Sequence, residues 1–191
     1  MTRTLILMFH PDPQRSKANA ALAKAASALP SVTVIDMRAR FPEADEPFGD
    51  GAAGAAMLLG ADRIVLQFPL QWYSTPALLK AWQDAVLTRM YYIHPKTEGD
   101  LLEGTPLMVA ATAGNVAEAY RRSGQNHFTI DEMLTPLKAT AHRCGLPWHA
   151  PHLVFTADWL SPAELAEAAE GYVAALAEFI ARTPVRQTEA A

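Results

Sequence analysis

The chain has 191 residues, a mass of 20.8 kDa and a net charge of −4 at pH 7, and half of its residues are hydrophobic. This length and composition fit one well-buried soluble domain, and the pI of about 5.8 argues against nucleic-acid binding, which needs a basic surface. No apolar run approaches the roughly 20 residues needed to span a bilayer, and the single Cys144 excludes an internal disulfide and a multi-cysteine metal site.

Five short apolar runs, separated by stretches long enough for a helix, are the candidate strands. They are 4–9, 32–37, 64–66, 105–112 and 152–156. Their lack of polar alternation is typical of strands covered on both faces of a parallel sheet. Helices are expected at 17–29, 52–60, 75–90, 131–144 and 161–182. We expect a long loop over 38–54 that leads into the second helix, a polar link over 91–104 and a structured loop over 116–128.

Proline and glycine mark several helix ends. Thr75 and Pro76 are expected as the N-cap and first residue of the third helix, because the missing N–H of a proline costs nothing there. Pro136 should either kink the helix at 131–144 or begin a new one capped by Thr135. Gly145 is expected to end that helix.

Strands that alternate with helices form parallel sheets, since parallel neighbours need crossover connections, and these are right-handed. Five strands fit an α/β, doubly wound parallel sheet of flavodoxin-like order 2-1-3-4-5. We expect a single domain over residues 1–184, a frayed tail over 185–191 and, in the absence of a secretion signal, a cytoplasmic location. The loops after strands one, three and four, at 10–16, 69–73 and 112–115, then meet at the sheet edge where such folds bind ligands.

The first of these loops carries groups suited to an anion. Hydroxyl, amide and cationic side chains, among them His10, Ser16 and Asn19, gather at the start of a helix, whose free N–H groups attract negative charge. The loop has no G-x-G-x-x-G pattern and no Walker lysine, which disfavours a Rossmann dinucleotide turn and nucleotide hydrolysis. The alternative is an ordinary capped helix start.

The other two loops suit a planar ligand. Gln71, Trp72 and Tyr73 offer an amide and two aromatic faces, while Gly114 allows close approach of the backbone. The alternative is that the aromatic residues only close the end of the core. A tricyclic ring that bears a phosphate, such as flavin mononucleotide (FMN), fits all three loops. His149 and His152 flank Pro151 and therefore do not share a helical face, so we expect no metal site.

The most specific motif is the block FPLQWYS at 68–74, followed by PALLK at 76–80 and Trp82. Supporting matches lie at 10–19, at 112–114, and at 136–137 ahead of 144–145. Together they resemble the flavodoxin-like NAD(P)H:quinone oxidoreductases. The resemblance is strongest to the small bacterial members, which include general stress proteins and ancillary subunits of potassium-efflux systems. The usual Thr-Thr-Gly-Gly turn of that family is replaced here by residues 112–115, TAGN.

The resemblance implies a flavin site. Residues of the first loop would contact the flavin phosphate and ribityl chain, those after strand three would line the isoalloxazine ring, and those after strand four would approach its N1/O2 edge. The cofactor-binding residues so implied are His10, Ser16, Asn19, Pro69, Leu70, Gln71, Trp72, Tyr73, Thr112, Ala113 and Gly114. The cofactor is expected to be FMN, with FAD as the alternative.

The resemblance also implies an enzyme. NAD(P)H would reduce the flavin and leave, and a quinone-like acceptor would take its place, in a ping-pong reaction that moves two electrons as hydride. Tyr120 and His127 are the catalytic candidates, and a homodimer is implied as well. Two alternatives are a flavodoxin-type electron carrier and a regulatory subunit of a potassium-efflux transporter. The net charge of −4 and the loop HPDPQRS disfavour the carrier, which is usually more acidic.

Overall fold

A computed structural model of the protein describes residues 3–42 and 48–183. Five parallel strands form one sheet in the order β2-β1-β3-β4-β5, which confirms the predicted α/β, flavodoxin-like topology. The strands are β1 (Thr4–Met8), β2 (Val32–Asp36), β3 (Arg63–Pro69), β4 (Leu107–Thr112) and β5 (His152–Val154). The tail predicted at 185–191 lies outside the described residues.

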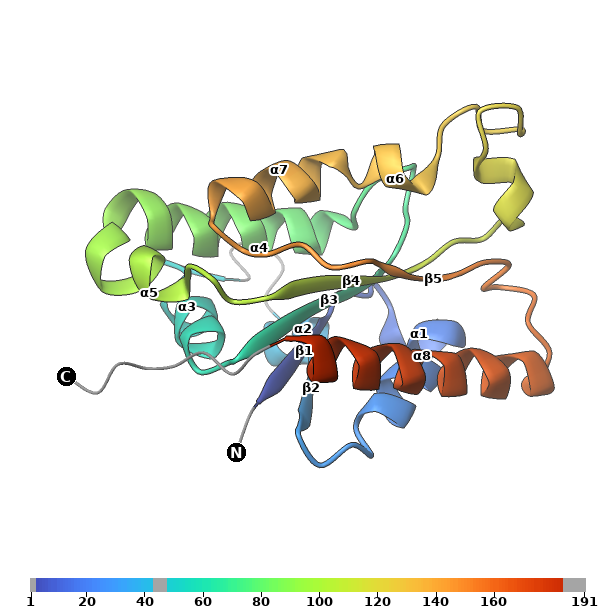
Figure 1. The fold of residues 1–191 in the computed structure, drawn as a ribbon, viewed down its shortest axis with the longest axis horizontal. Helices are drawn as coiled ribbons and strands as arrows, with labels where there is room; N and C mark the ends of the chain where they lie inside the picture. Colours follow the sequence, from blue (N-terminus) through green and yellow to red (C-terminus); the bar gives the residue numbers. More distant parts are fainter. Residues whose placement is uncertain (1–2, 43–47, 184–191) are drawn as a thin grey trace.

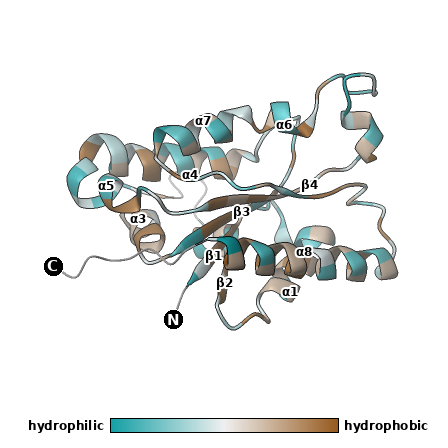
Figure 2. Ribbon diagram, in the orientation of Figure 1, coloured by the Kyte–Doolittle hydropathy of each residue, from teal (hydrophilic) through white to brown (hydrophobic). Residues whose placement is uncertain are grey.

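Helices cover both faces of the sheet (Figure 1). On one face, α1 (Ala18–Ala26) and α8 (Pro162–Arg182) lie side by side and bury Leu22 and Tyr172 against Ile6 and Val65. The opposite face carries α3 (Ala52–Leu59), α4 (Ala77–Thr88), α5 (Asp100–Leu102) and α7 (Thr135–Arg143). Figure 2 shows the strands in hydrophobic colours between helices whose surfaces are mixed, as expected for a sheet buried on both sides.

Two segments predicted to lack regular structure contain helical turns. Within 38–54, α2 (Met37–Arg40) follows β2 directly, because the Asp36 carboxylate accepts hydrogen bonds from the first free N–H groups of that turn. Within 91–104, the π-helical turns η2 (Arg89–Ile93) and η3 (Pro95–Gly99) continue α4 into α5. The polar residues that suggested an open link bond to one another, as in the Lys96–Asp100 ion pair.

The helix predicted at 131–144 is two helices. The short α6 (Ile130–Met133) ends before Pro136, and α7 begins at Thr135, so the proline marks a new start and not a kink. The N-cap of α7 is Leu134 and not the expected Thr135. Gly145 follows α7 with a φ of +65°, which confirms it as the helix stop. At α4 the N-cap is Pro76 and not the expected Thr75, so the helix begins one residue later than predicted.

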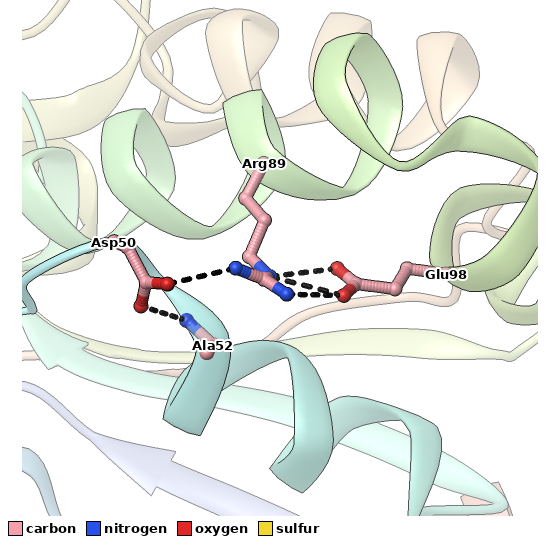
Figure 3. Close-up of polar contacts among 4 residues, drawn as sticks. All are labelled: Asp50, Ala52, Arg89 and Glu98. Atoms are coloured by element: carbon pink, nitrogen blue, oxygen red, sulfur yellow. Dashed lines mark hydrogen bonds and ion pairs between the residues drawn. The ribbon is translucent and has the colours of Figure 1, made fainter.

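An ion-pair network fastens α3 to the end of α4 (Figure 3). The guanidinium of Arg89 contacts the Glu98 carboxylate at 2.8–3.0 Å and donates to Asp50 at 2.9 Å. Asp50 in turn accepts the N–H of Ala52, the first residue of α3, at 3.0 Å. Gly51 stands between them with a φ of +79°, and a Cβ there would lie 2.7 Å from Ala85 O in α4.

We expect Gly51→Ala to destabilise the fold more than Gly49→Ala. Both glycines have positive φ, which costs a non-glycine residue about 1–2 kcal/mol. A Cβ at Gly49 would meet no described atom within 4 Å, whereas one at Gly51 would collide with the α4 backbone. Overpacking of this kind should cost about 1–3 kcal/mol more. Urea unfolding of the two variants measures the difference in their free energies of unfolding. Equal losses of stability would show that α3 and α4 move apart to accommodate the added Cβ without cost.

Candidate functional site

The loops after β1, β3 and β4 meet at one edge of the sheet, here called the rim. Pro69 of β3 and Thr112 of β4 are register partners, and the N–H of Leu70 donates to Thr112 O at 2.8 Å. Asn19, in the first turn of α1, donates from Nδ2 to Thr112 Oγ1 at 2.9 Å. The structure therefore brings the start of α1, which follows the first predicted loop, into contact with the ends of β3 and β4.

Asn19 and Thr112 form the buried floor of the rim. Their exposed fractions are 2% and 3%, and the hydrogen bond between them occupies the Asn19 amide. The side chain of Gln67 in β3 holds Asn19 in place by donating a hydrogen bond from Nε2 to Asn19 O at 2.8 Å. The direct contact with a flavin that was predicted for Asn19 and Thr112 remains a prediction, and their established role is to join the loops.

The first loop presents a helix N-terminus. A 3₁₀ turn, η1 (Pro13–Arg15), precedes α1, and no side chain of the described residues caps α1, which argues against the alternative of an ordinary capped helix start. The first N–H groups of a helix have no partner within it. Ser16 is half-buried at the entrance. Burial lowers the pKa of His10, whose Nδ1 accepts the Asp12 N–H at 3.1 Å, and the imidazole is therefore neutral at pH 7.

The second loop is a strained aromatic turn. Gln71 and Ser74 exchange two backbone hydrogen bonds of 2.9 and 3.0 Å across Trp72 and Tyr73. The φ angles of these two residues are +47° and +63°, the arrangement of a type I′ turn, which favours Asn-Gly. Trp72 is 94% exposed and Tyr73 is 54% exposed, so they do not close the core. Strain at such a position is typical of functional sites.

The third loop adds free backbone donors. Ala113 is buried and its N–H donates to Val154 O at 2.8 Å, whereas Gly114 is exposed. Within the described part of the chain, the N–H groups of Gly114 and Asn115 have no hydrogen-bond partner, and neither have those of Trp72 and Tyr73. These four donors lie on the two loops predicted to face a planar ring.

The loop after β5 also reaches the rim, which the sequence did not predict. A Cβ placed on Gly114 would lie 3.3 Å from Asp158 Oδ2. The next residue, Trp159, is 83% exposed, and Thr156 has a φ of +51°. The sequence feature that could have indicated this loop is Trp159, a large aromatic residue shortly before the last helix.

Two cavities open beside the aromatic turn. The ring cavity, of about 200 Å³, is lined by Leu70, Trp72, Tyr73, Tyr120 and Met133. The α6 cavity, of about 410 Å³, is lined by Tyr73, Gln125, Asn126, Phe128, Glu132 and Met133. Tyr73 and Met133 border both. No pattern in the sequence indicated that Glu132 or Met133 would line a cavity.

The two catalytic candidates differ in position. Tyr120 lines the ring cavity, and its ring packs against Phe155 with centroids 5.7 Å apart. His127 is exposed in a left-handed backbone conformation with a φ of +57°, next to Asn126 and Phe128 of the α6 cavity but not in its lining. The structure thus places Tyr120 at the site and His127 at its border.

A groove of about 600 Å³ runs between α4 and α7, from Ser74 near the rim to Cys144. Met133 also borders this groove.

In residues 3–42 and 48–183 no three His, Cys, Asp or Glu side chains are grouped to hold a metal ion. None of the helices in these ranges is long and apolar enough to cross a bilayer. His152 packs against Tyr172, with ring centroids 5.1 Å apart.

The chain matches, over residues 2–180, the family model described as flavodoxin-like fold. It belongs to this flavodoxin-like family. One similar protein is an uncharacterized NAD(P)H oxidoreductase of Bacillus subtilis, 36% identical over 90% of this chain and 84% of that protein. Another is the glutathione-regulated potassium-efflux system ancillary protein KefG of Cronobacter sakazakii, 38% identical over 92% of this chain and 93% of the relative.

Three solved structures share the fold. General stress protein 14 of Treponema denticola in complex with FMN is 28% identical over 92% of this chain and 98% of that chain, with a TM-score of 0.80. An NADPH-quinone reductase from P. pentosaceus is 28% identical over 90% and 95%, with a TM-score of 0.74. A structure named as a tryptophan halogenase of Streptomycin violaceusniger is 38% identical over 88% and 95%, with a TM-score of 0.80. These names do not agree on one activity.

We expect the double variant Trp72→Asn/Tyr73→Gly to be more stable than the natural protein by about 1–2 kcal/mol. Asn-Gly adopts the type I′ turn without the cost that left-handed backbone imposes on aromatic residues. Urea unfolding measures the gain. Trp159→Asn is the control, since it also removes an exposed tryptophan but from ordinary backbone geometry. An equal gain in the control would show that exposure, and not backbone strain, is responsible.

Proposed function

We propose that this protein is an FMN-dependent NAD(P)H oxidoreductase that transfers two electrons to a quinone-like acceptor, with FAD as the alternative cofactor. The observation that carries the proposal is the exposed Trp72–Tyr73 turn, held in strained geometry beside free N–H groups and two cavities. Similarity to an NAD(P)H oxidoreductase, an NADPH-quinone reductase and an FMN-bound stress protein supports it.

The residues at the rim fit FMN. Trp72 and Tyr73 offer aromatic faces to the isoalloxazine ring, and the unpaired N–H groups of Gly114 and Asn115 suit its electron-rich N1/O2 edge. The uncapped start of α1, with Ser16 before it, suits the phosphate. Pro69, Leu70, Gln71 and Ala113 complete the surface on which the cofactor would lie, while His10, Asn19 and Thr112 hold the loops in place.

Bound FMN supplies the capacity to accept hydride from NAD(P)H and to give it to a second substrate. The protein contributes position and electrostatics. The backbone donors of the third loop would stabilise negative charge at the N1/O2 edge of a bound flavin, and Tyr120 or His127 would donate a hydrogen bond or a proton there. The aromatic turn would hold one side of the ring and leave the other side for substrates. Nucleotide and acceptor would then use that side in turn, as a ping-pong mechanism requires.

Two other functions fit parts of the structure. A flavodoxin-type electron carrier needs no substrate pocket, and the cavities beside Tyr73 favour an enzyme over a carrier. The similarity to KefG supports an additional role as a partner of a potassium-efflux transporter, at the cytoplasmic side of a membrane.

A homodimer contact is suited by the groove between α4 and α7, with the exposed Tyr92 and Ile93 near its end. A copurification experiment separates these partners.

We expect the purified protein to be yellow and Trp72→Ala to bind FMN about 5–150 times more weakly. The reason is that stacking on an aromatic side chain contributes about 1–3 kcal/mol. Fluorescence titration of the apoprotein with FMN gives the dissociation constants, and mass spectrometry of the released cofactor identifies it. Leu101→Ala, which removes an exposed apolar side chain in α5, away from the three loops of the rim, is the control. A colourless protein that takes up neither FMN nor FAD would refute the proposal.

We expect His127→Gln to keep the flavin and to slow turnover about tenfold or more. The loss corresponds to about 1.4 kcal/mol, the scale of one charge-stabilising group, and an imidazole N–H can donate a hydrogen bond to a reduced ring or quinone. Stopped-flow kinetics should place the slowing in flavin reduction or reoxidation and not in nucleotide binding. Unchanged rates in both half-reactions, with a slow Tyr120→Phe variant, would assign the role to Tyr120 alone.

A further inference from the structure

The α6 cavity has one charged residue in its wall. Tyr73, Phe128 and Met133 give it apolar and aromatic surfaces, and Gln125 and Asn126 add amides. Glu132 is the remaining lining residue, and its carboxylate is about one-third exposed. A cavity of about 410 Å³ lies within the usual range for small-molecule sites, which is about 300–1,000 Å³.

The Glu132 carboxylate is held in place as an anion. Its Oε2 accepts the Thr129 N–H and the Thr129 hydroxyl, each at 3.0 Å, while the Glu132 N–H donates to Thr129 Oγ1 at 3.2 Å. This reciprocal capping box begins α6, so the side chain cannot turn away without uncapping the helix. The hydrogen bonds from Thr129, aided by the Arg122 guanidinium, lower the pKa of Glu132.

Arg122 pairs with Glu132 Oε1 from outside the lining of the cavity, and its side chain is 72% exposed. The carboxylate is therefore the end of this ion pair that lies nearer to a ligand in the cavity. The amides have a different role. Gln125 Oε1 accepts from Asn115 Nδ2 at 3.2 Å, which leaves the Gln125 NH₂ group free to donate. Carbonyl oxygens of a ligand can therefore be bound, whereas a negative group would meet the Glu132 carboxylate.

We propose that the α6 cavity takes flat, uncharged aromatic carbonyl compounds and that Glu132 is the residue that excludes anionic ones. This inference rests on the proposed function and names the acceptor class for the same site. Aromatic walls from Tyr73 and Phe128 bind the ring faces, and the Gln125 amide binds a carbonyl oxygen. Glu132 adds repulsion against sulfonated or carboxylated analogues, which is specificity by an unfavourable contact.

The test compares 1,4-naphthoquinone with its sulfonated analogue on the flavin-loaded protein. We expect the natural protein to prefer the uncharged compound in kcat/KM, and the preference to shrink as salt increases. Glu132→Gln should raise the ratio of sulfonated to uncharged kcat/KM about fivefold, the effect of one charge at about 4 Å in water. Glutamine retains the capping box, so the fold should survive the change.

Glu164→Gln is the matched control. Glu164 forms the same capping box with Ser161 at the start of α8, outside the lining of the cavity. It should leave the ratio unchanged. An unchanged ratio in Glu132→Gln, or the same change in both variants, would overturn the proposal.

A binding readout separates this inference from the proposed function. Quenching of tryptophan fluorescence gives the dissociation constants of the two quinones without turnover. The same fivefold change in their ratio is expected there for Glu132→Gln. If the protein binds both compounds with this selectivity but oxidises no NAD(P)H, the inference stands and the proposed function falls. If it turns over both compounds without this selectivity, the proposed function stands and the inference falls.

Discussion

A buried chain of hydrogen bonds from Gln67 through Asn19 to Thr112 holds the rim together. Each of these residues is at most 3% exposed, and each belongs to a different part of the chain: β3, α1 and β4. Polar groups at this depth are costly unless they are paired, so loss of one member leaves the others unsatisfied in the interior. The three loops therefore have one relative arrangement, and a site built upon them inherits it.

Unlike the buried hydrogen bonds, the aromatic turn costs the folded protein stability. Trp72 and Tyr73 stand in left-handed conformations while exposing most of their surface, so they contribute strain and little packing. The turn persists because Leu70 is anchored to Thr112 and the pair Gln71–Ser74 closes it with two hydrogen bonds. A sequence chosen for stability alone would place Asn-Gly here. The two exposed aromatic residues at these positions therefore favour a binding role for the turn over a purely structural one.

Much of this could be predicted from the sequence because the signals were local. The five apolar runs, the order of the sheet and Gly145 as a helix stop follow from periodicity and backbone chemistry. The turns over 89–99 could not be predicted, because they depend on contacts such as Arg89 with Glu98 and on continuity with α4. Helix ends at Pro76 and Leu134 shifted by a residue, as caps commonly do.

Within the site, residue type indicated the place but not the role. Asn19 and Thr112 carry polar groups at the right loops, yet the fold uses these groups to bond to each other. The spacing of Thr129 and Glu132 is that of a capping box, and only the tertiary structure shows that Glu132 lies in a cavity wall. The cause is the same in both cases, because tertiary surroundings decide the role of the side chain. Sequence spacing reveals neither the pairing of Asn19 with Thr112 nor the cavity beside Glu132.

The division between a buried floor and exposed loops explains how proteins with the same fold at the rim can differ in activity. Its floor is fixed by buried side chains, so contacts with a ligand fall to backbone N–H groups, to exposed aromatic faces and to loops such as 116–129 and 156–160. Backbone donors do not depend on residue type, whereas the lining of the α6 cavity does. Similar structures named for different activities at 28–38% identity agree with this division. Specificity in this chain should therefore be sought in residues 120–133, where exposed side chains can vary without disturbing the floor.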